Sequence, residues 1–230
     1  MSESARRVVV ETDRVAPGRV RVVPNGYDWD RICSTPEAAR SIRLEFDVGD
    51  DLLLCTVGRF DALKGHEVLL HALASPCVPA HSRLLIVGEG PSESSLRQLA
   101  RTLGLADRCI FAGFRSDVYN VMAAADLIVH PSLSEAQCQV LIEALALARP
   151  VVATKVGAAS ELLIPGKTGW LVPPRDPTAL ATAISEALQD PTRAHRYGCA
   201  GRARVRAMYP IERMLAAYEE VYRRLLGRLQ

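Results

Sequence analysis

Short apolar runs alternate with amphipathic segments along the chain from residue 51 onward. Because a buried strand reads as a short, continuous apolar run, we expect strands at 52–57, 84–87, 109–112, 127–129, 150–153 and 170–172. Helical spacing between these runs predicts helices at 66–74, 91–103, 118–125, 138–147 and 158–163. From residue 177 the pattern is helical to the end, with breaks expected at 198–201 and near Pro210.

This alternation predicts a parallel sheet that is covered by helices on both faces. Right-handed crossovers then make the fold class α/β, a Rossmann-like doubly wound parallel sheet of about six strands. Ligands of such sheets bind outside the carboxyl ends of the strands, where the strand order reverses. With the order 3-2-1-4-5-6, this place lies between the loops at 58–65 and 130–137, which follow the first and fourth strands.

The first fifty residues do not follow the alternation. They contain a helix expected at 4–11, a strand at 20–23, a turn at 24–26 and a second helix at 37–45. This segment therefore looks like an incomplete amino-terminal stub in front of one Rossmann domain.

Composition and charge narrow the class of protein. The 230 residues are 49% hydrophobic with a formal net charge of +2, which excludes a disordered chain and argues against nucleic acid as a partner. No run of eighteen apolar residues occurs, and residues 1–7 lack the apolar core of a signal peptide, so we expect a cytoplasmic protein. Six scattered cysteines without a Cys-x-x-Cys pair give a zinc or redox site no support.

Four charged residues in or beside the two loops are the candidates for chemistry. Arg59 and Lys64 can converge on one anion, and a guanidinium beside an ammonium suits a diphosphate; alternatively, both are solvated charges at a helix start. Glu135 stands before a helix and Glu143 inside it, where the two carboxylates could hold hydroxyls on both sides of a diphosphate. Alternatively, Glu135 only complements the helix dipole and Glu143 is only an exposed helix residue. The apolar neighbours of Glu143 favour a function, because a carboxylate among them is costly to bury without a partner.

Weaker signals surround these residues. The free backbone N–H groups at 136–139 are expected to face the crevice and to favour a phosphate or sugar oxygen. The turn at 88–91 lacks the third glycine of a dinucleotide fingerprint, and it is better interpreted as a tight turn that lets backbone approach a ligand. We interpret His66, His71, His81, His130 and Trp170 as structural, because their spacing suits no metal.

Several glycine, proline and charged motifs follow one another in a fixed order. They are Gly58-Arg59-x4-Lys64-Gly65, Gly88-x-Gly90-Pro91, Gly113-Phe114, Pro131-Ser132-x2-Glu135-x7-Glu143-Ala144, Pro150-Val151-Val152-Ala153-Thr154 and Gly166-x2-Gly169-Trp170-Leu171-Val172. In this order they resemble the carboxyl-terminal, donor-binding domain of glycosyltransferase family 4, the group 1 type with the GT-B fold. The resemblance covers about residues 20–227.

The resemblance implies that the domain binds a nucleotide-activated sugar, a UDP- or GDP-sugar. Arg59 and Lys64 would hold the diphosphate, Glu143 the ribose hydroxyls and Glu135 the transferred sugar, with Glu135, Arg59 and Lys64 as the catalytic set. The implied donor-binding residues are Gly58, Arg59, Lys64, Gly88, Gly90, Phe114, Arg115, Glu135, Ala136, Gln137, Cys138, Gln139 and Glu143. The loop at Phe114 and Arg115 would border the base. No metal and no cofactor are implied, and the reaction would be retaining transfer of a hexose with electrostatic stabilisation of the departing diphosphate.

The chain departs from the family in two places. The family usually has a glycine and an aromatic residue after the first glutamate, where this chain has Ala136-Gln137, which bears on donor choice and activity. A GT-B enzyme also has an amino-terminal Rossmann domain that carries the acceptor, and this domain is missing. We therefore expect residues 1–26 to be its remnant with the interdomain hinge, 27–50 a linker and helix, 51–208 the nucleotide-sugar-binding Rossmann domain, and 209–230 a terminal helix.

Two kinds of function remain open. The first is the donor-binding half of a retaining glycosyltransferase that acts on a glycan, lipid or small-molecule acceptor and has little activity alone. The alternative is a non-enzymatic fragment, or a subunit that completes a split enzyme by docking on a partner or as a homodimer, through 1–24 and the terminal helix. Arginines at 193, 196, 202, 204, 206 and 213 also suit contact with anionic lipid at the inner membrane face, or they line a solvated helix face.

Overall fold

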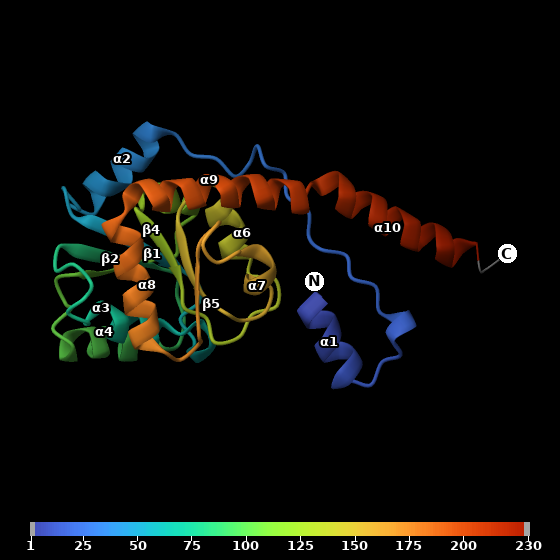
Figure 1. Ribbon diagram of the computed structural model, residues 1–230, viewed down its shortest axis with the longest axis horizontal. Helices are drawn as coiled ribbons and strands as arrows, with labels where there is room; N and C mark the ends of the chain where they lie inside the picture. The colour runs from blue at the N-terminus through green and yellow to red at the C-terminus, as the bar shows by residue number, and fades with distance from the viewer. Residues whose placement is uncertain (1–2, 228–230) are drawn as a thin grey trace.

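The computed structural model describes residues 3–227, and its centre is a parallel sheet of six strands (Figure 1). The strand order β3-β2-β1-β4-β5-β6 confirms the predicted topology and the doubly wound fold. The strands are β1 (Leu52–Val57), β2 (Ser82–Val87), β3 (Cys109–Gly113), β4 (Leu127–His130), β5 (Val151–Thr154) and β6 (Trp170–Val172). All adjacent strands pair in parallel, as the continuous apolar runs predicted.

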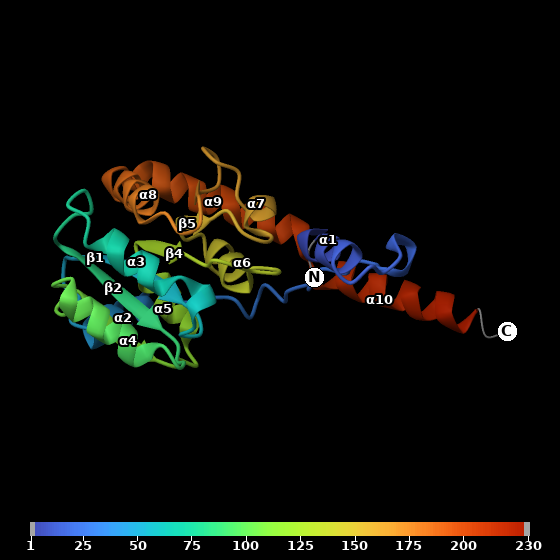
Figure 2. The same ribbon diagram turned by 90° about the horizontal axis from the view of Figure 1, so that it is seen from below.

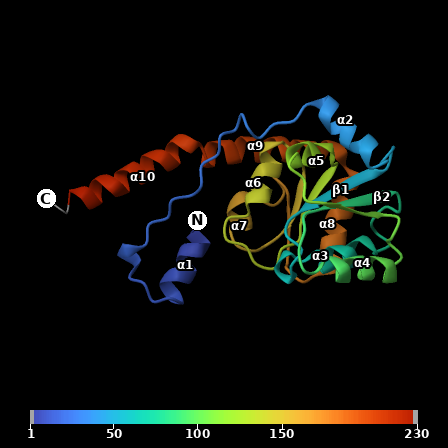
Figure 3. The same cartoon turned by 180° about the vertical axis from the view of Figure 1, so that it is seen from behind.

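Helices cover both faces of the sheet (Figures 1 and 3). One face carries α3 (His66–Leu73), α4 (Glu93–Thr102) and α8 (Pro177–Gln189). The other carries α2 (Pro36–Glu45), α5 (Val118–Ala124), α6 (Gln139–Ala146), α7 (Ala159–Leu162) and α9 (Pro191–Met208). Successive side chains of a strand point to opposite faces. Leu54 of β1 therefore packs under α3, α4 and α8, whereas Leu53 and Cys55 pack on the opposite face, under the other five helices.

The helix α9 runs without a break through Gly198 and Gly201, so the expected break at 198–201 is wrong. A Cβ atom at Gly198 would lie 2.2 Å from the carbonyl oxygen of Ala148, and one at Gly201 would lie 2.4 Å from Leu145 Cδ2. The two glycines therefore let α9 lie directly against the end of α6. This packing outweighs the helix-propensity cost of about 1 kcal/mol for each glycine. The break expected near Pro210 is confirmed, since α9 ends at Met208 and α10 (Ile211–Leu226) follows.

The amino-terminal segment lies outside the sheet. It contains α1 (Glu3–Glu11) and the short 3-10 helix Pro17–Arg19, and it then runs past α10, where Arg21 pairs with Glu220 (Figure 2). The strand expected at 20–23 is wrong: in the described chain these residues pair with no strand. Apolar alternation is not sufficient for a strand, because the backbone groups also need a partner strand.

The helix α10 projects away from the Rossmann domain (Figures 1 and 3). None of its residues is buried within the described structure. At its base the chain is fixed to the domain, because Tyr27 N donates to Tyr209 O at 3.0 Å and Gly26 N lies 3.2 Å from Met214 Sδ. Every helix between residues 3 and 227 is too short or too polar to cross a bilayer.

The close approach of α9 to α6 predicts a loss of stability when Gly198 gains a side chain. We expect Gly198→Ala to lower the free energy of unfolding by about 1–3 kcal/mol, because the backbone at Ala148 must move. Urea denaturation measures this change. Gly18→Ala is the control, since no atom lies within 4 Å of its Cβ position, and it should stay within about 0.5 kcal/mol of the wild type. Equal stability of the Gly198→Ala variant and the wild type would contradict the argument.

Candidate functional site

The loops after β1 and β4 meet at the carboxyl edge of the sheet. Leu133 N donates to Leu63 O at 2.7 Å, and Asp61 Oδ1 caps the short 3-10 helix Ala62–Lys64 by accepting from Leu63 N at 2.9 Å. Gly65 has φ +66°, and a Cβ atom there would lie 2.1 Å from Pro131 O. A glycine is therefore required where the two loops touch.

Glu135 is the centre of this edge. Its Oε1 accepts hydrogen bonds from Lys64 Nζ at 2.6 Å and from Ser132 Oγ at 2.8 Å, and His130 Nε2 lies 3.3 Å from the same oxygen. The side chain of Glu135 is 12% exposed and that of Lys64 is 28% exposed. A pair this well covered is screened little by solvent, so it holds the two loops together more firmly than a surface ion pair does.

The environment of Glu135 keeps it ionised at neutral pH. Burial raises the pKa of its carboxyl group, but interactions with His130, Lys64 and Ser132 outweigh burial and lower the pKa to about 2. An ionised carboxylate accepts hydrogen bonds and does not donate them. Glu135 is thus suited to bind hydroxyl groups or to stabilise positive charge, and it is not suited to be a general acid.

A cavity of about 310 Å³ lies beside Glu135, and we call it the Glu135 cavity. It is lined by Lys64, His130, Glu135, Ala136, Gln137, Cys138, Gln139 and Val140. All four residues that were expected at 136–139 therefore lie in its wall. Cys138 is the residue before α6 and has left-handed backbone angles, φ 57° and ψ 55°. A non-glycine residue in this conformation is held there by its surroundings, here a buried site in which Cys138 Sγ lies 3.8 Å from Val156 O.

A second cavity, of about 360 Å³, lies at the carboxyl ends of β1, β2 and β3, and we call it the Phe114 cavity. Its wall contains the predicted residues Gly58, Arg59, Gly88, Phe114 and Arg115, together with Val57, Val87, Glu89 and Val118. Phe114 is 73% exposed, so its ring is accessible to a flat ligand. The predicted Gly90 lines neither cavity; a Cβ atom there would lie 2.5 Å from Phe60 O, so its role is close packing.

Arg59 and Lys64 start from one loop but line different cavities. The Arg59 side chain is 71% exposed, and its Nε lies 3.9 Å from Asp61 Oδ2. Lys64 is directed to Glu135. The two cations therefore line different cavities, Arg59 the Phe114 cavity and Lys64 the Glu135 cavity.

The guanidinium of Arg115 is bound by protein carboxylates. It donates to Asp117 Oδ1 at 2.8 Å and to Glu45 Oε2 at 2.9 Å, and the bonds to Asp117 and Glu45 raise its pKa further. Arg115 thus links the loop after β3 to the end of α2. It forms part of the cavity wall, and its charge is already neutralised.

Glu143 is half-buried on α6 and faces α5. Tyr119 Oη donates to Glu143 Oε1 at 3.4 Å. Burial raises the pKa of Glu143, and the bond from Tyr119 acts in the opposite direction. Among the described residues no cation pairs with this carboxylate, so it differs from Glu135 in having a neutral partner.

One group of side chains at the site has metal-binding types. Ligand atoms of His130, Glu135 and Cys138 lie within 4.8 Å of one another. However, the ammonium of Lys64 is already paired with the Glu135 carboxylate. Burial also raises the pKa of the Cys138 thiol to about 12, which disfavours the thiolate that a metal needs. These residues fit a metal poorly, and a metal-free site stays a prediction.

Sequence reasoning gave no site role to His130 and Ser132, which contact Glu135, or to Tyr119, which contacts Glu143; Tyr119 and Glu143 line neither cavity. His130 was interpreted as structural, yet it is buried beside Glu135. The available signal was its place at the carboxyl end of β4, five residues before Glu135. The partners of Arg115 had no such signal, because Glu45 is 70 residues away.

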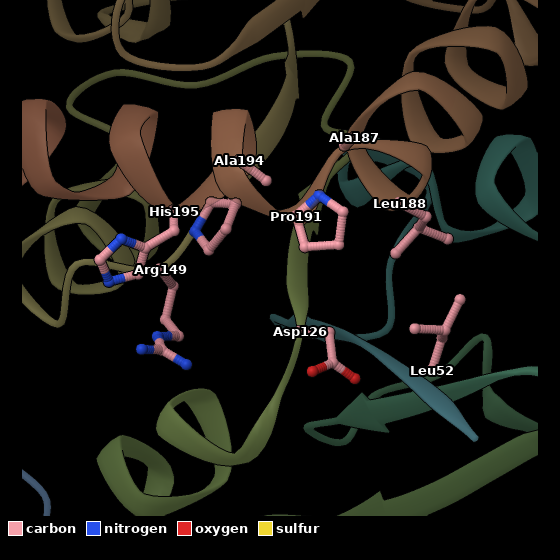
Figure 4. A pocket seen from close by; sticks show the side chains of 9 residues that line it. Leu52, Asp126, Arg149, Ala187, Leu188, Pro191, Ala194 and His195 are labelled. Carbon is pink, nitrogen blue, oxygen red and sulfur yellow. The ribbon is translucent and has the colours of Figure 1, made fainter. Parts of the chain in front are cut away.

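A third cavity, of about 190 Å³, lies at the amino ends of the strands (Figure 4). Its polar side chains serve the fold. Asp126 Oδ2 accepts from Leu53 N at 2.7 Å and from Arg43 Nη1 at 3.2 Å, and Arg149 Nη1 donates to Ala123 O at 3.2 Å. We therefore place the functional site at the carboxyl edge.

The low pKa of Glu135 predicts acid sensitivity. A carboxyl group whose pKa is lower in the folded protein stabilises it above the unfolded pKa, and this stabilisation disappears as the pH falls from about 4.5 towards 2. Between about pH 5 and pH 3, the wild type should lose about 1–2 kcal/mol more of its unfolding free energy than Glu135→Gln loses. Urea denaturation at each pH measures the difference. The control Glu67→Gln, an exposed position on α3, should behave as the wild type; identical pH dependence of the Glu135→Gln variant and the wild type would refute the assignment.

Known proteins resemble this chain in sequence. It is 34% identical over 191 residues to a GDP-mannose-dependent alpha-(1-6)-phosphatidylinositol monomannoside mannosyltransferase of Mycolicibacterium smegmatis, which covers 78% of this chain and 50% of the relative. It is 34% identical over 237 residues to a D-inositol 3-phosphate glycosyltransferase of the same organism, covering 94% of this chain and 53% of the relative. The chain thus spans about half the length of the curated relatives that it matches.

Solved structures share the fold. The crystal structure of Anabaena Alr3699/HepE in complex with UDP has a TM-score of 0.90 at 26% identity, over 96% of this chain and 62% of that one. The carboxyl-terminal domain of a group 1 glycosyl transferase, LpcC from Francisella tularensis, shows the same fold with a TM-score of 0.72 at 22% identity, over 81% of this chain and the whole of that one.

Residues 41–204 match the family model of the group 1 glycosyl transferases. This range contains all six strands and both cavities of the carboxyl edge. The expected resemblance is confirmed, and the chain, with its GT-B-type Rossmann fold, belongs to the group 1 glycosyltransferase family.

Proposed function

We propose that this domain is the donor-binding half of a retaining glycosyltransferase and takes a UDP- or GDP-sugar. One observation carries the proposal: the edge where the strand order reverses holds two cavities, one with the Lys64–Glu135 pair in its wall and one with Arg59 and Phe114 in its wall. The complex of Anabaena HepE with UDP and the name of the GDP-mannose-dependent relative support a nucleotide sugar as the ligand.

The two cavities suit the two ends of such a donor. We place the base in the Phe114 cavity, where the exposed ring of Phe114 offers a stacking surface. The diphosphate lies between Arg59 and Lys64, and Glu143 accepts from the ribose hydroxyls. The transferred hexose enters the Glu135 cavity, whose wall offers the Glu135 carboxylate and the backbone of 136–139.

In the proposed reaction, the bond from the anomeric carbon to the diphosphate oxygen breaks and a bond to an acceptor hydroxyl oxygen forms. The hydroxyl proton goes to the departing diphosphate, and the configuration at the anomeric carbon is retained. Lys64 and Arg59 supply positive charge where negative charge develops, so no metal is needed for that task. The negative charge of Glu135 stabilises the electron-poor sugar and orients Lys64.

The acceptor is proposed to be a glycan, lipid or small molecule that binds mainly outside this domain, which alone would have little activity. A membrane-peripheral place at the cytoplasmic face fits a lipid acceptor, such as the one in the mannosyltransferase's name. However, some of the arginines between residues 193 and 213 bind backbone carbonyl groups of the domain. Arg204 donates to Leu162 O at 3.1 Å, and Arg193 Nη2 donates to Glu186 O at 3.1 Å. This segment is therefore less available to anionic lipid than its sequence suggested.

Calorimetry with UDP and GDP tests the donor site. We expect one of them to bind, and Arg59→Ala to weaken binding by about tenfold, because a charge-assisted hydrogen bond to a phosphate is lost. Arg59 is exposed, so the variant should keep the wild-type unfolding free energy. Arg101→Ala, at an exposed position on α4, is the matched control and should bind as the wild type does. Absence of binding by both nucleotides at millimolar concentration would exclude the donor site.

The terminal helix supports a second function, docking on another Rossmann domain. The helix α10 has no buried residue, and it exposes a large apolar set made of Leu215, Tyr218, Tyr222, Leu225 and Leu226. A helix face of this kind is a typical interaction surface. We propose that it packs on an amino-terminal Rossmann domain of the same or another chain, and on a second copy of this chain where that domain is lacking.

Analytical ultracentrifugation tests the docking surface. We expect the chain alone to dimerise at concentrations near 100 μM or below, which corresponds to an association free energy of about −5.5 kcal/mol or stronger. Leu215→Glu with Leu225→Glu should make it monomeric, because two charges would be buried without partners. UDP or GDP affinity should not change, since α10 lies outside both cavities. A wild-type chain that is monomeric throughout would contradict self-association.

A further inference from the structure

Tyr119 is the neighbour that contacts the carboxylate of Glu143. It belongs to α5, and its hydroxyl donates to Glu143 Oε1 at 3.4 Å across the gap between α5 and α6. No Arg, Lys or His is paired with Glu143 in the described part of the chain. The half-buried carboxylate therefore depends on a phenol for the hydrogen bond that a cation would normally provide.

The surroundings keep this phenol in its donor form. Burial, followed by the charge of Glu143, raises the pKa of the Tyr119 hydroxyl, which favours its protonated, donor form. The second phenol that faces Glu143 is Tyr27, from the segment before α2, and its pKa is also raised by burial and then by Glu143. The Tyr27 hydroxyl is buried and makes no hydrogen bond within residues 3–227. Of the two tyrosines, Tyr119 is thus the one that contacts the carboxylate.

Tyr119 and Glu143 do not line the Phe114 cavity, but Val118, the residue before Tyr119 in the first turn of α5, does. A carboxylate rotates easily about its last bond, and a hydrogen bond to one oxygen limits this rotation. Because Tyr119 takes Oε1, the other oxygen of Glu143 remains for a ligand hydroxyl.

We infer that Tyr119 is a positioning residue that orients the Glu143 carboxylate toward the two ribose hydroxyls of the bound nucleotide. This inference rests on the proposed donor site, and it adds a residue that acts through Glu143 without contacting the donor. The consequence is chemical: Tyr119 sets how strongly the site prefers a ribose over a sugar that lacks both hydroxyls. Removing its hydroxyl leaves the base and diphosphate contacts in place and weakens the ribose contact alone.

The test compares two ligands, the tighter-binding of UDP and GDP and its 2′,3′-dideoxy analogue. Calorimetry gives the ribose preference, defined as the dissociation constant of the analogue divided by that of the ribonucleotide. It is measured for the wild type, Tyr119→Phe, Glu143→Gln, the double variant and Tyr222→Phe. The last variant removes a phenol from the exposed face of α10, outside both cavities, and is the matched control.

We expect a wild-type ribose preference of about tenfold or more, because hydrogen bonds to a charged group are lost with the analogue. Tyr119→Phe should lower the ribose preference by about three- to tenfold, because the variant binds the ribonucleotide more weakly while its affinity for the analogue stays at the wild-type value. Adding Tyr119→Phe to Glu143→Gln should change nothing further, since the two residues act in one chain of contacts. Tyr222→Phe should match the wild type.

Each other outcome has a distinct meaning. Equal loss of affinity for both ligands in Tyr119→Phe would show a merely structural role and overturn the inference. An unchanged preference in Tyr119→Phe would overturn it while leaving the donor site intact. If the wild type binds the ribonucleotide without any ribose preference, Glu143 does not bind the ribose hydroxyls, and the inference is wrong. Absence of binding by UDP and GDP to the wild type would refute the proposed function itself.

Discussion

The ion pair between Lys64 and Glu135 is the interaction on which the functional edge depends. Lys64 belongs to the loop after β1 and Glu135 to the loop after β4, and these strands are neighbours in the sheet although 71 residues separate the two side chains. A largely buried carboxylate costs several kcal/mol unless it is paired and hydrogen-bonded. One oxygen of Glu135 accepts hydrogen bonds from Lys64 and Ser132, and His130 lies beside the same oxygen. The two loops are consequently held in one arrangement, and together they form a defined wall of the Glu135 cavity.

Backbone contacts set the distance over which this pair can form. The loop after β5 reaches Glu135 through Gly157, where a Cβ atom would lie 2.0 Å from Glu135 O and φ is +49°. Gly65 does the same between the loops after β1 and β4. Three loops from three neighbouring strands therefore meet with main chain against main chain. Side chains at these contacts would push the loops apart and separate Lys64 from Glu135.

The sheet, and the edge of the sheet at which most of the candidate site residues lie, could be predicted because their signals are local. Apolar runs closed by glycines mark strands, and the loops that follow β1 and β4 must face the same edge once the strand order is known. The remaining features depend on contacts between distant residues. The helix α9 is continuous because its glycines pack on the backbone of Ala148. Residues 20–23 form no strand because no strand lies beside them in the described chain. The contacts of His130 depend on the position of Glu135. No pattern within a short window contains this information, so the break in α9 and the strand at 20–23 were predicted wrongly and the contact of His130 with Glu135 was not predicted.

The glycine contacts of α9 have a mechanical consequence. Gly198 and Gly201 bring the axis of α9 so near to Ala148 and Leu145 that the two helices leave no layer of side chains free to slide between them. At its far end α9 passes directly into α10, with Tyr209 bonded to Tyr27 at the junction. A force on α10 would therefore reach α9 through this junction, and α9 rests on the carboxyl end of the helix that begins beside the Glu135 cavity. The proposed docking surface and the proposed donor site are thus connected through the packing of α9 on α6.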